Sequence, residues 1–314
     1  MTMNLKINPA PISISVYDRL EHLSRCLDSI KANPLALETE LYIFSDAPKS
    51  SDEERIDAVR KFCSEISGFK KVHLLCQTEN NYKKNMTDAR TIPLREHGKM
   101  IRLEDDNIVS PEFLKYMNEA LDYYEKEPTV LGVSGYSPPI SQEKYTEKDV
   151  YLSKIYSTWG HGTWANKSFL EFCLESAPYR DMLANDMQRK VRSFHPSLDR
   201  ALKKIDEGSH YAPDQMLTYF LIKNDQFQVK PVKSLVKNIG HDGSGINCGV
   251  SSHFDHPVSL ERVDSRLESL EYIAEIDRRQ YRFFYPTLRV KISRRLKTFR
   301  NRLTQFLALS SPRV

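Results

Sequence analysis

Short apolar runs alternate with helical patterns along the first 135 residues of the chain. Four of these runs have the length and composition of buried strands, and they lie at residues 11–16, 41–44, 72–76 and 100–103. Helical periodicity separates them, after a predicted N-cap at Asp18, after Ser51, and from about Asn85 to His97 with an interruption near Pro93. This alternation predicts a parallel, doubly wound α/β sheet.

The fourth predicted strand ends in three consecutive acids, Glu104, Asp105 and Asp106, and Ser110 and Pro111 then suit the start of a helix. Open α/β sheets bind ligands at the carboxyl ends of their strands. Adjacent carboxylates repel one another unless a cation lies among them, and a hard divalent cation binds both carboxylate oxygens and substrate phosphates. The triplet therefore indicates a metal-assisted ligand site, and the alternative is a solvated acidic turn.

The second half of the chain continues with a strand at 130–136 and a glycine-rich segment at 156–164 that contains both tryptophans. Glycines let backbone approach a ligand and aromatic rings stack on it, so this segment is either a ligand pocket or an aromatic core cluster. The remaining pattern predicts helices at 166–176, 179–206 and Asp214 to Lys223, short strands at 227–229 and 234–236, and a glycine-dense loop at 238–249.

Composition narrows the class of protein. The chain has 314 residues, of which 40% are hydrophobic and 28% charged, as in ordinary globular proteins. Its five cysteines include no Cys-x-x-Cys pair, which favours reduced thiols and a cytoplasmic location. We expect no signal peptide and no membrane span. No Gly-x-Gly-x-x-Gly or Gly-Lys-Ser/Thr motif follows the first strand, which disfavours a Rossmann dehydrogenase and a P-loop NTPase.

The positive charge is concentrated at the C-terminus. From Arg278 onward there are eleven Lys or Arg residues and no acid, although the whole chain carries a net charge of only +4. Residues 287–309 combine a basic surface with apolar side chains at helical spacing, which predicts a basic amphipathic helix suited to an anionic membrane surface. Packing on the catalytic domain and a coiled-coil partner are the alternatives. Nucleic acid is disfavoured as a partner because the basicity is confined to this one segment.

Several motifs together resemble the N-acetylglucosaminyltransferase I type of glycosyltransferase. They cover roughly residues 11–250 in order: Pro11-Ile-Ser-Ile-Ser-Val-Tyr-Asp18-Arg19, Arg25-Cys-Leu-Asp28, Ser45-Asp46, Glu104-Asp105-Asp106, Ser110-Pro-Glu-Phe113, Trp159-Gly-His-Gly162, Asp214 and the loop from Gly240. Bacterial cell-surface polysaccharide transferases with an Asn-Ile-Gly-x-Asp-Gly loop are similar in character. The resemblance implies a GT-A fold, which is the Rossmann-like nucleotide-diphospho-sugar transferase fold. It also implies an inverting mechanism, a nucleotide-sugar donor and Mn2+ or Mg2+.

The resemblance also assigns roles by position. The donor-binding residues would be Tyr17, Asp18, Arg19, Asp46, Arg90, Glu104 and Asp105, with Asp46 reading the base, commonly uracil. The sugar or acceptor pocket would be shaped by Trp159, Gly160, His161 and Gly162. Asp214 would be the catalytic base, although an acid in Ala-Pro-Asp-Gln could instead cap its helix.

Asp106 would be the direct protein ligand of the metal ion. Transferases of this type often place a histidine of the late loop near the donor phosphates, where Asn247 stands here, so His241 or His253 is the candidate for that position. The chemistry requires such a division of roles, because one carboxylate must deprotonate the acceptor hydroxyl while a cation neutralises the departing diphosphate.

The sequence therefore predicts a hexosyl- or N-acetylhexosaminyl-transferase of surface polysaccharide synthesis, acting on a glycan or lipid-linked acceptor at the inner face of the cell membrane. We expect a catalytic domain over residues 1–255, with a nucleotide-sugar half (1–135) and an acceptor half (136–255), and a helical extension over 256–314. Two alternatives remain. One is a sugar-1-phosphate nucleotidyltransferase, and the other is a non-catalytic, membrane-associated scaffold of the same fold.

Overall fold

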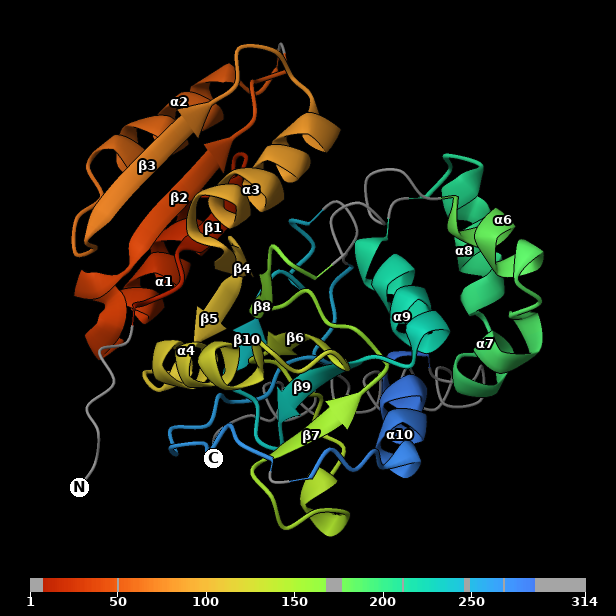
Figure 1. Ribbon diagram of the computed structural model, residues 1–314. Coiled ribbons are helices and arrows are strands. Elements are labelled where there is room, and N and C mark those ends of the chain that lie inside the picture. Colours follow the sequence, from red (N-terminus) through yellow and green to blue (C-terminus); the bar gives the residue numbers. More distant parts are fainter. Residues whose placement is uncertain are drawn as a thin grey trace, which may run out of the picture.

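An eight-stranded sheet forms the centre of the protein. The computed structural model describes residues 8–49, 51–167, 177–210, 212–245, 249–267 and 269–285. The strands lie in the following spatial order: β3 (Lys71–Cys76), β2 (Glu40–Ser45), β1 (Ile12–Val16), β4 (Lys99–Glu104), β8 (His161–Trp164), β6 (Val130–Ser134), β9 (Phe227–Pro231) and β7 (Val150–Ser153) (Figure 1).

The sheet is mixed, so the prediction of a parallel sheet holds for only half of it. The strands from β3 to β4 are parallel, as expected for strands joined by crossover helices. β8 then runs antiparallel to both β4 and β6, β9 runs parallel to β6, and β7 runs antiparallel to β9. The glycine-rich tryptophan segment is therefore partly a strand of the central sheet, which its sequence pattern did not indicate.

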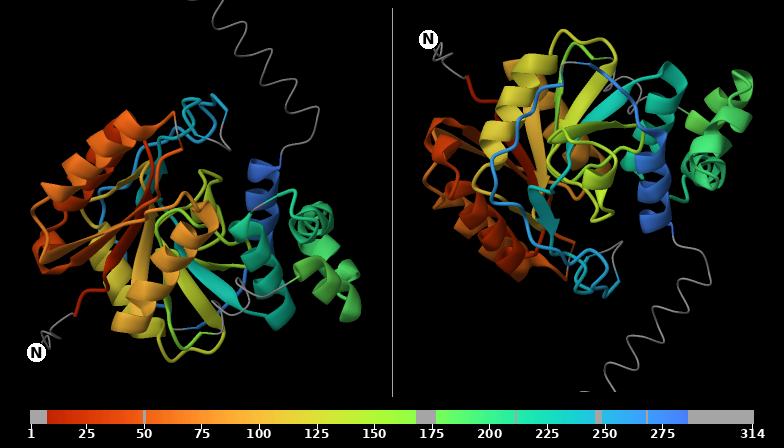
Figure 2. Two further views of the ribbon diagram at one scale, coloured as in Figure 1. Left: turned by 90° about the horizontal axis from the view of Figure 1, so that it is seen from above. Right: turned by 90° about the horizontal axis from the view of Figure 1, so that it is seen from below.

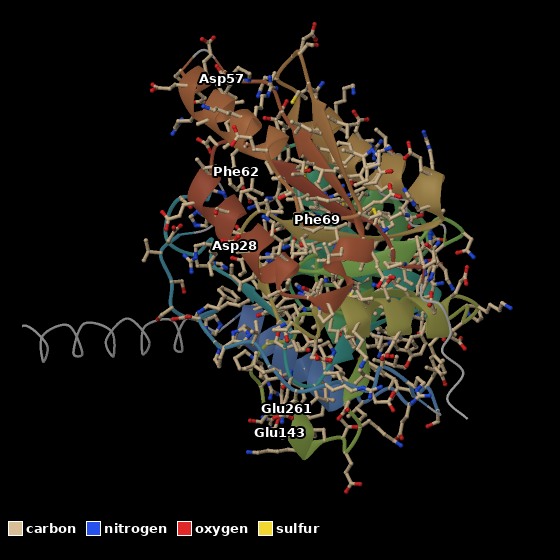
Figure 3. The ribbon with its side chains drawn as sticks, turned by 90° about the vertical axis from the view of Figure 1, so that its left-hand side faces the viewer. Asp28, Asp57, Phe62, Phe69, Glu143 and Glu261 are labelled. Carbon is tan, nitrogen blue, oxygen red and sulfur yellow. The ribbon has the colours of Figure 1, made fainter. Side chains whose placement is uncertain are left out.

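Helices cover both faces of the parallel half. α1 (Leu20–Lys31) and α2 (Glu53–Ser64) lie on one face, and α3 (Tyr82–His97) packs on β1, β2 and β4 (Figure 1). Alternate side chains of β2 point to opposite faces of the sheet. Leu41 and Ile43 belong to the main core, whereas Tyr42 and Phe44 pack against Ala89 of α3 on the other face. Figure 3 views the α1 and α2 side, where Asp28 and Asp57 occupy exposed helix positions.

Two local predictions in this half were wrong. Asp18 does not cap α1, because the N-cap position is Arg19 and makes no side-chain cap hydrogen bond. α3 begins earlier than predicted, after an Asn81 cap that accepts a hydrogen bond from the Lys84 N–H, and it continues through Pro93. Pro93 has no N–H to donate to the Ala89 carbonyl, and Ser13 Oγ of β1 donates to that carbonyl instead, at 2.5 Å. Gly98 then ends the helix in the left-handed conformation (φ 74°).

The acidic triplet leads into a small second sheet. β5 (Asn107–Val109) pairs antiparallel with β10 (Val236–Asn238), and α4 (Phe113–Tyr124) follows β5. Ser110 accepts a hydrogen bond from the Glu112 N–H at 3.3 Å, but the helix begins three residues after it rather than at Pro111. The antiparallel β5–β10 pair joins the chain after the triplet to the late glycine-rich loop.

The segment predicted as one helix over 179–206 is three short helices, and this prediction was wrong. α6 (Pro178–Ala184), α7 (Gln188–Phe194) and α8 (Leu198–Asp206) pack around a small cluster that also receives Tyr219 and Ile222 of α9 (Pro213–Asn224). The first break contains Asp186 at φ 51°, and the second contains Pro196, which disfavours helical backbone at His195. These helices lie at the side of the molecule away from β3 (Figure 2).

α10 (Ala274–Phe284) lies within the region expected as a helical extension, although no particular helix was assigned to these residues, and it packs near α9 (Figure 1). Its buried Asp277 accepts hydrogen bonds from Ser153 Oγ at 2.6 Å and from the Lys154 N–H at 2.8 Å, which attaches the helix to β7. Short 3-10 helices occur at Pro34–Glu38 and Gln142–Lys144. The basic segment 287–309 and nearly all of the helix predicted at 166–176 lie outside the described residues.

Candidate functional site

Arg19 and the acidic triplet meet at the carboxyl ends of β1 and β4. These strands are parallel neighbours, with Ser15 opposite Glu104, so the residues that follow them emerge at the same edge of the sheet. Arg19 Nε donates to Asp105 Oδ2 at 3.2 Å, and Arg19 Nη1 lies 3.0 Å from Asp106 Oδ2. A second guanidinium nitrogen also pairs with Asp105. One arginine thus contacts both aspartates, which explains how two buried carboxylates are accommodated side by side.

Burial and crowding perturb the first two acids. Burial, together with the charge of Asp106, raises the pKa of Glu104 to about 7. Burial also raises the pKa of Asp105 to about 6, although the positive charge of Arg19 opposes the rise. Thr158 Oγ1 donates to Glu104 at 3.4 Å. Such perturbed acids are typical of functional sites, because their charge is held where water cannot solvate it fully.

Asp106 is fixed from the opposite side by the β10 end and the loop after it. Asn238 Nδ2 donates to Asp106 Oδ1 at 2.7 Å, Asn107 Nδ2 donates to the same oxygen at 3.1 Å, and the Ile239 N–H donates to the Asp106 carbonyl at 2.9 Å. A Cβ atom at Gly240 would overlap the Asp106 carboxylate and approach Arg19 Nη1 to 3.1 Å. Only glycine therefore lets the loop backbone lie this close to Asp106.

The imidazole ring of His241 lies near the Asp106 carboxylate. The ring stacks on Phe254 with centroids 4.2 Å apart and meets Trp159 edge to face at 5.8 Å. Burial lowers the pKa of His241, which favours the neutral ring, while the charge of the nearby Asp106 opposes the shift. Its Nε2 atom is buried and has no hydrogen-bond partner in the described part of the chain.

The unpartnered Nε2 distinguishes the two candidate late-loop histidines. His253 Nε2 is within hydrogen-bond distance (2.9 Å) of the Phe283 carbonyl, so it is already engaged, whereas His241 is free to bind a further group. Among the described residues no group of three His, Cys, Asp or Glu side chains could hold a metal ion. A metal ion here would therefore need Asp106, His241 and oxygen atoms from outside the protein. The carboxylate and the orphaned imidazole fit that requirement.

The predicted base-reading residue lies farther along the same edge of the sheet. Asp46 follows β2, is buried, and accepts hydrogen bonds from the Ala47 and Asn81 N–H groups, both at 2.9 Å. These bonds fix the turn in which the carboxylate lies. Tyr17 Oη donates to Asp52 at 2.8 Å, and Asp18 pairs with Arg55 at 3.2 Å. Tyr17 and Asp18 thus contact α2 and the loop before it, and no contact between them and the triplet is seen in the described residues.

The four residues predicted to shape the sugar pocket do not all lie at the site. Trp159 is half-buried and contacts His241, so it belongs to the site. His161 and Gly162 lie within β8 in the core, where a Cβ atom at Gly162 would meet Met117 at 3.0 Å. Burial lowers the pKa of His161 to about 3, which makes it a neutral core histidine. Gly160 adopts φ 60° and its carbonyl accepts the Gly135 N–H at 2.7 Å.

Arg90 and Asp214 occupy separate positions. Arg90 is a buried residue of α3, and its charge contributes to lowering the pKa of His161. Asp214 lies in the first turn of α9 but is not its N-cap, which is Ala212. Burial raises the pKa of Asp214, while first-turn N–H groups and the nearby His210 oppose the shift. A half-buried carboxylate with a raised pKa and no side-chain hydrogen bond among those described is suited to accept a proton.

Three residues of the site were missed by sequence reasoning. Asn107 and Asn238 bind Asp106, and His22 Nε2 lies 3.1 Å from Asp242 Oδ2, which joins α1 to the glycine-rich loop. His22 could have been found, because it lies three residues after Arg19 on the same helical face. The pairing of β5 with β10 brings in Asn238, and no local pattern in the sequence indicates that pairing.

No family model matches the chain, and none of the curated proteins matches it. At low identity, its structure is similar to solved glycosyltransferases. The mannosyltransferase PcManGT from Pyrobaculum calidifontis, solved with GDP-Man and Mn2+, is 16% identical over 70% of this chain and 75% of that chain, with a TM-score of 0.39.

TarS from S. aureus, residues 1–349, is 13% identical and has a TM-score of 0.40, and its complex with UDP is 15% identical and has a TM-score of 0.39. Both alignments cover 72% of this chain and only 59% of the TarS fragment. Because these TM-scores are low, the case for a function rests on the residues of the site.

Proposed function

We propose that this protein is an inverting, metal-dependent glycosyltransferase that moves a sugar from a nucleotide-sugar donor to a hydroxyl of a glycan or lipid-linked acceptor. The observation that carries the proposal is the junction of Arg19, Asp105 and Asp106 at the carboxyl ends of two central parallel strands. Carboxylates at that edge suit a divalent cation that would bind the donor diphosphate, and Gly240 lets the loop backbone lie against the Asp106 carboxylate.

The donor would lie along the carboxyl edge from β2 to β4. Arg19 is placed to pair with a phosphate, since its guanidinium offers several donors to anionic oxygens. Asp46, held in its turn behind β2, would accept a hydrogen bond from the base, and this position favours a UDP-sugar. Tyr17, Asp18 and Arg90 are proposed donor residues whose described contacts are with other parts of the chain.

Asp106 and His241 would hold the metal ion together with oxygen atoms of the donor. Mg2+ prefers oxygen ligands, so the imidazole favours Mn2+. When bound, the ion supplies positive charge that stabilises the departing diphosphate. Asn238 and Asn107 orient the Asp106 carboxylate, and Trp159 and Phe254 both pack against the His241 ring.

Asp214 is the proposed general base. In an inverting transfer the acceptor oxygen forms a bond to the anomeric carbon while the bond from that carbon to the diphosphate breaks. The acceptor hydroxyl proton passes to the Asp214 carboxylate, whose raised pKa increases its basicity. The proposed base and metal ligand belong to different elements, α9 and the end of β4, and an inverting transfer requires them to act on opposite faces of the sugar.

The reaction type is tested by incubating the protein with UDP- and GDP-sugars in the presence of Mn2+ and measuring nucleoside diphosphate release. We expect release from one class of donor, faster with a hydroxyl acceptor than with water alone. Pyrophosphate formed from a nucleoside triphosphate and a sugar 1-phosphate would instead identify a nucleotidyltransferase.

The described part of the chain contains no helix that is both long and apolar enough to cross a membrane. We propose peripheral binding to an anionic membrane surface through the basic segment 287–309. Liposome flotation of the full chain against a chain ending at residue 286 tests this part separately, with binding expected only for the full chain and reduced by salt.

A further inference from the structure

A cavity of about 290 Å³ opens between α8 and the start of α9. Its lining residues are Ser197, Arg200, Ala201, Lys204, His210 and Gln215. Gln215 directly follows Asp214 in the chain, and the charge of His210 acts on the Asp214 carboxylate. The cavity therefore adjoins the proposed general base and is formed by elements other than those of the donor site.

The lining is cationic and contains no carboxylate. Arg200 and Lys204 lie four residues apart on one face of α8, so both side chains reach the same space. Neither forms an ion pair within the described residues. The charges around them are otherwise matched, because Arg192 pairs with Asp199 at 2.7 Å and Lys203 with Glu207 at 3.8 Å. Arg189 of α7 is likewise in no ion pair among the described residues, but of these unpaired cations only Arg200 and Lys204 line the cavity.

The cavity also contains an unsatisfied polar atom. Gln215 Nε2 donates to Tyr285 Oη at 3.3 Å, but Gln215 Oε1 is buried and has no hydrogen-bond partner among the residues that the structure describes. A buried acceptor without a donor is costly, so it indicates a missing donor such as a ligand hydroxyl. Cationic groups for an anion next to an acceptor for a hydroxyl together match a phosphorylated sugar or polyol.

The size of the cavity limits the ligand. At about 290 Å³ it is just below the range of roughly 300–1,000 Å³ found for small-molecule sites. It can hold a phosphate group with part of an attached sugar, but a complete nucleotide-sugar would need more room. The cavity is therefore suited to the acceptor rather than to the donor.

We infer that the α8–α9 cavity binds a phosphate ester group of the acceptor and so presents an acceptor hydroxyl to Asp214. The inference rests on the proposed function and adds to it the substrate class: an acceptor carrying a phosphate. Such a phosphate can belong to a lipid carrier or to a water-soluble sugar phosphate. Gln215 bonds Tyr285, which in the sequence lies just before the basic segment proposed to bind membrane, and this favours the lipid source.

The test compares two double variants of the full chain that lose the same charge. Arg200→Gln/Lys204→Gln neutralises the cavity, and Arg189→Gln/Lys203→Gln neutralises two exposed cations of α7 and α8 that do not line it. Dissociation constants are measured by calorimetry at fixed ionic strength for inorganic phosphate and for decyl phosphate below its micellar concentration. Binding of UDP with Mn2+ is measured on the same samples.

We expect the cavity variant to weaken phosphate binding at least tenfold, while the control stays within twofold of the natural protein and UDP binding is unchanged in both. Cavity-dependent binding of decyl phosphate that is much tighter than that of inorganic phosphate identifies a lipid-linked acceptor, and equal affinities identify a soluble one. Equal losses in both double variants, or no phosphate binding by the natural protein, would overturn the inference. Failure of UDP to bind while phosphate still binds to the cavity would refute the proposed function alone.

Discussion

Asp106 is the residue on which the proposed donor site depends most. It contacts Arg19, Asn107 and Asn238, and the loop backbone at Gly240 lies directly against its carboxylate. Because three side chains hold this carboxylate, it has little freedom to move away from a new methyl group. A substitution at Gly240 can therefore change the position of the Asp106 carboxylate without removing any functional group of the site.

We predict that Gly240→Ala displaces Asp106 and weakens metal-dependent nucleotide binding by about 10- to 100-fold, as second-layer changes at metal sites do. The matched control is Gly249→Ala, because a Cβ atom there meets nothing within 4 Å. Calorimetry of UDP with Mn2+ measures the effect. Equal affinities for the two variants would show that the contact between Gly240 and Asp106 does not influence nucleotide binding.

Asp214→Asn should abolish sugar transfer and leave donor affinity largely intact, because the amide keeps the shape but cannot accept the proton. In the natural protein the base acts only when deprotonated. Burial raises the pKa of Asp214, so activity should fall as the pH drops through a value above that of an ordinary aspartate. The fall in activity at low pH is measured as the pH dependence of kcat/KM. Full turnover by the Asp214→Asn variant would contradict the assignment of Asp214 as the general base.

The chemistry of single residues could be anticipated better than their contacts. The position of Asp106 at the end of a strand and of Asp214 at the start of a helix followed from local patterns. The ion pair of Arg19 with both aspartates did not, since it requires β1 and β4 to be neighbours in space. The role of Asp18 as a helix cap was wrong because Arg55 pairs with its carboxylate instead.

At the scale of elements, the β5–β10 pair couples the triplet to the late loop. Asn238→Ala removes the 2.7 Å bond to Asp106 and also the acceptor for the Gly240 N–H at 2.9 Å. We predict a loss of about 1–3 kcal/mol in the free energy of unfolding, since buried groups lose their partners. The affinity for UDP with Mn2+ should fall in parallel.

Asn224→Ala serves as the control, because this exposed residue ends α9 and its side chain bonds the Phe220 carbonyl one turn earlier. Urea unfolding and calorimetry of both variants separate the two effects. If Asn238→Ala loses stability but binds the nucleotide normally, β10 supports the fold and not the donor site.

Elements with strong local patterns were predicted well, and those defined by tertiary contacts were not. The strands β1 to β4 and the helix α9 have clear apolar runs or repeats. β8 does not, because Gly160 and Gly162 lack side chains to create a pattern, and its place between β4 and β6 depends on backbone pairing. α10 has a polar sequence whose buried groups Asp277 and Gln280 bond β7 and β9, so its place depends on tertiary contacts.

At the scale of the whole molecule, a buried polar network joins α10 to the last strands of the sheet. Lys230 of β9 is fully buried, and its Nζ donates to Gln280 Oε1 at 3.1 Å. Burial lowers the pKa of Lys230 to about 7, while the nearby Asp277 opposes the shift. An unfolded lysine has a pKa of about 10.4, so between pH 7 and 10 the unfolded chain binds more protons than the folded chain.

The free energy of unfolding should therefore rise with pH in this range, by about 1.5 kcal/mol between pH 7.0 and 8.5 from Lys230 alone. Lys230→Met should lack this increment, whereas Lys233→Met should retain it, because Lys233 is exposed and pairs with Glu261 at the surface. Urea unfolding at the two pH values measures the difference. The same pH dependence in Lys230→Met and in the natural protein would show that Lys230 is charged in the fold.

The central claim is that the junction of Arg19, Asp105 and Asp106 binds a nucleoside diphosphate together with a metal ion. The most direct test is the melting temperature of the natural protein and of Asp106→Asn with UDP, GDP, CMP or ADP, each with Mn2+ or with EDTA. A ligand at 100 times its dissociation constant adds about 2.7 kcal/mol of stability, which shifts the melting temperature by several degrees. We predict stabilisation by one nucleotide, only with Mn2+ and only in the natural protein. No shift with any nucleotide, or an equal shift in Asp106→Asn, would contradict the account.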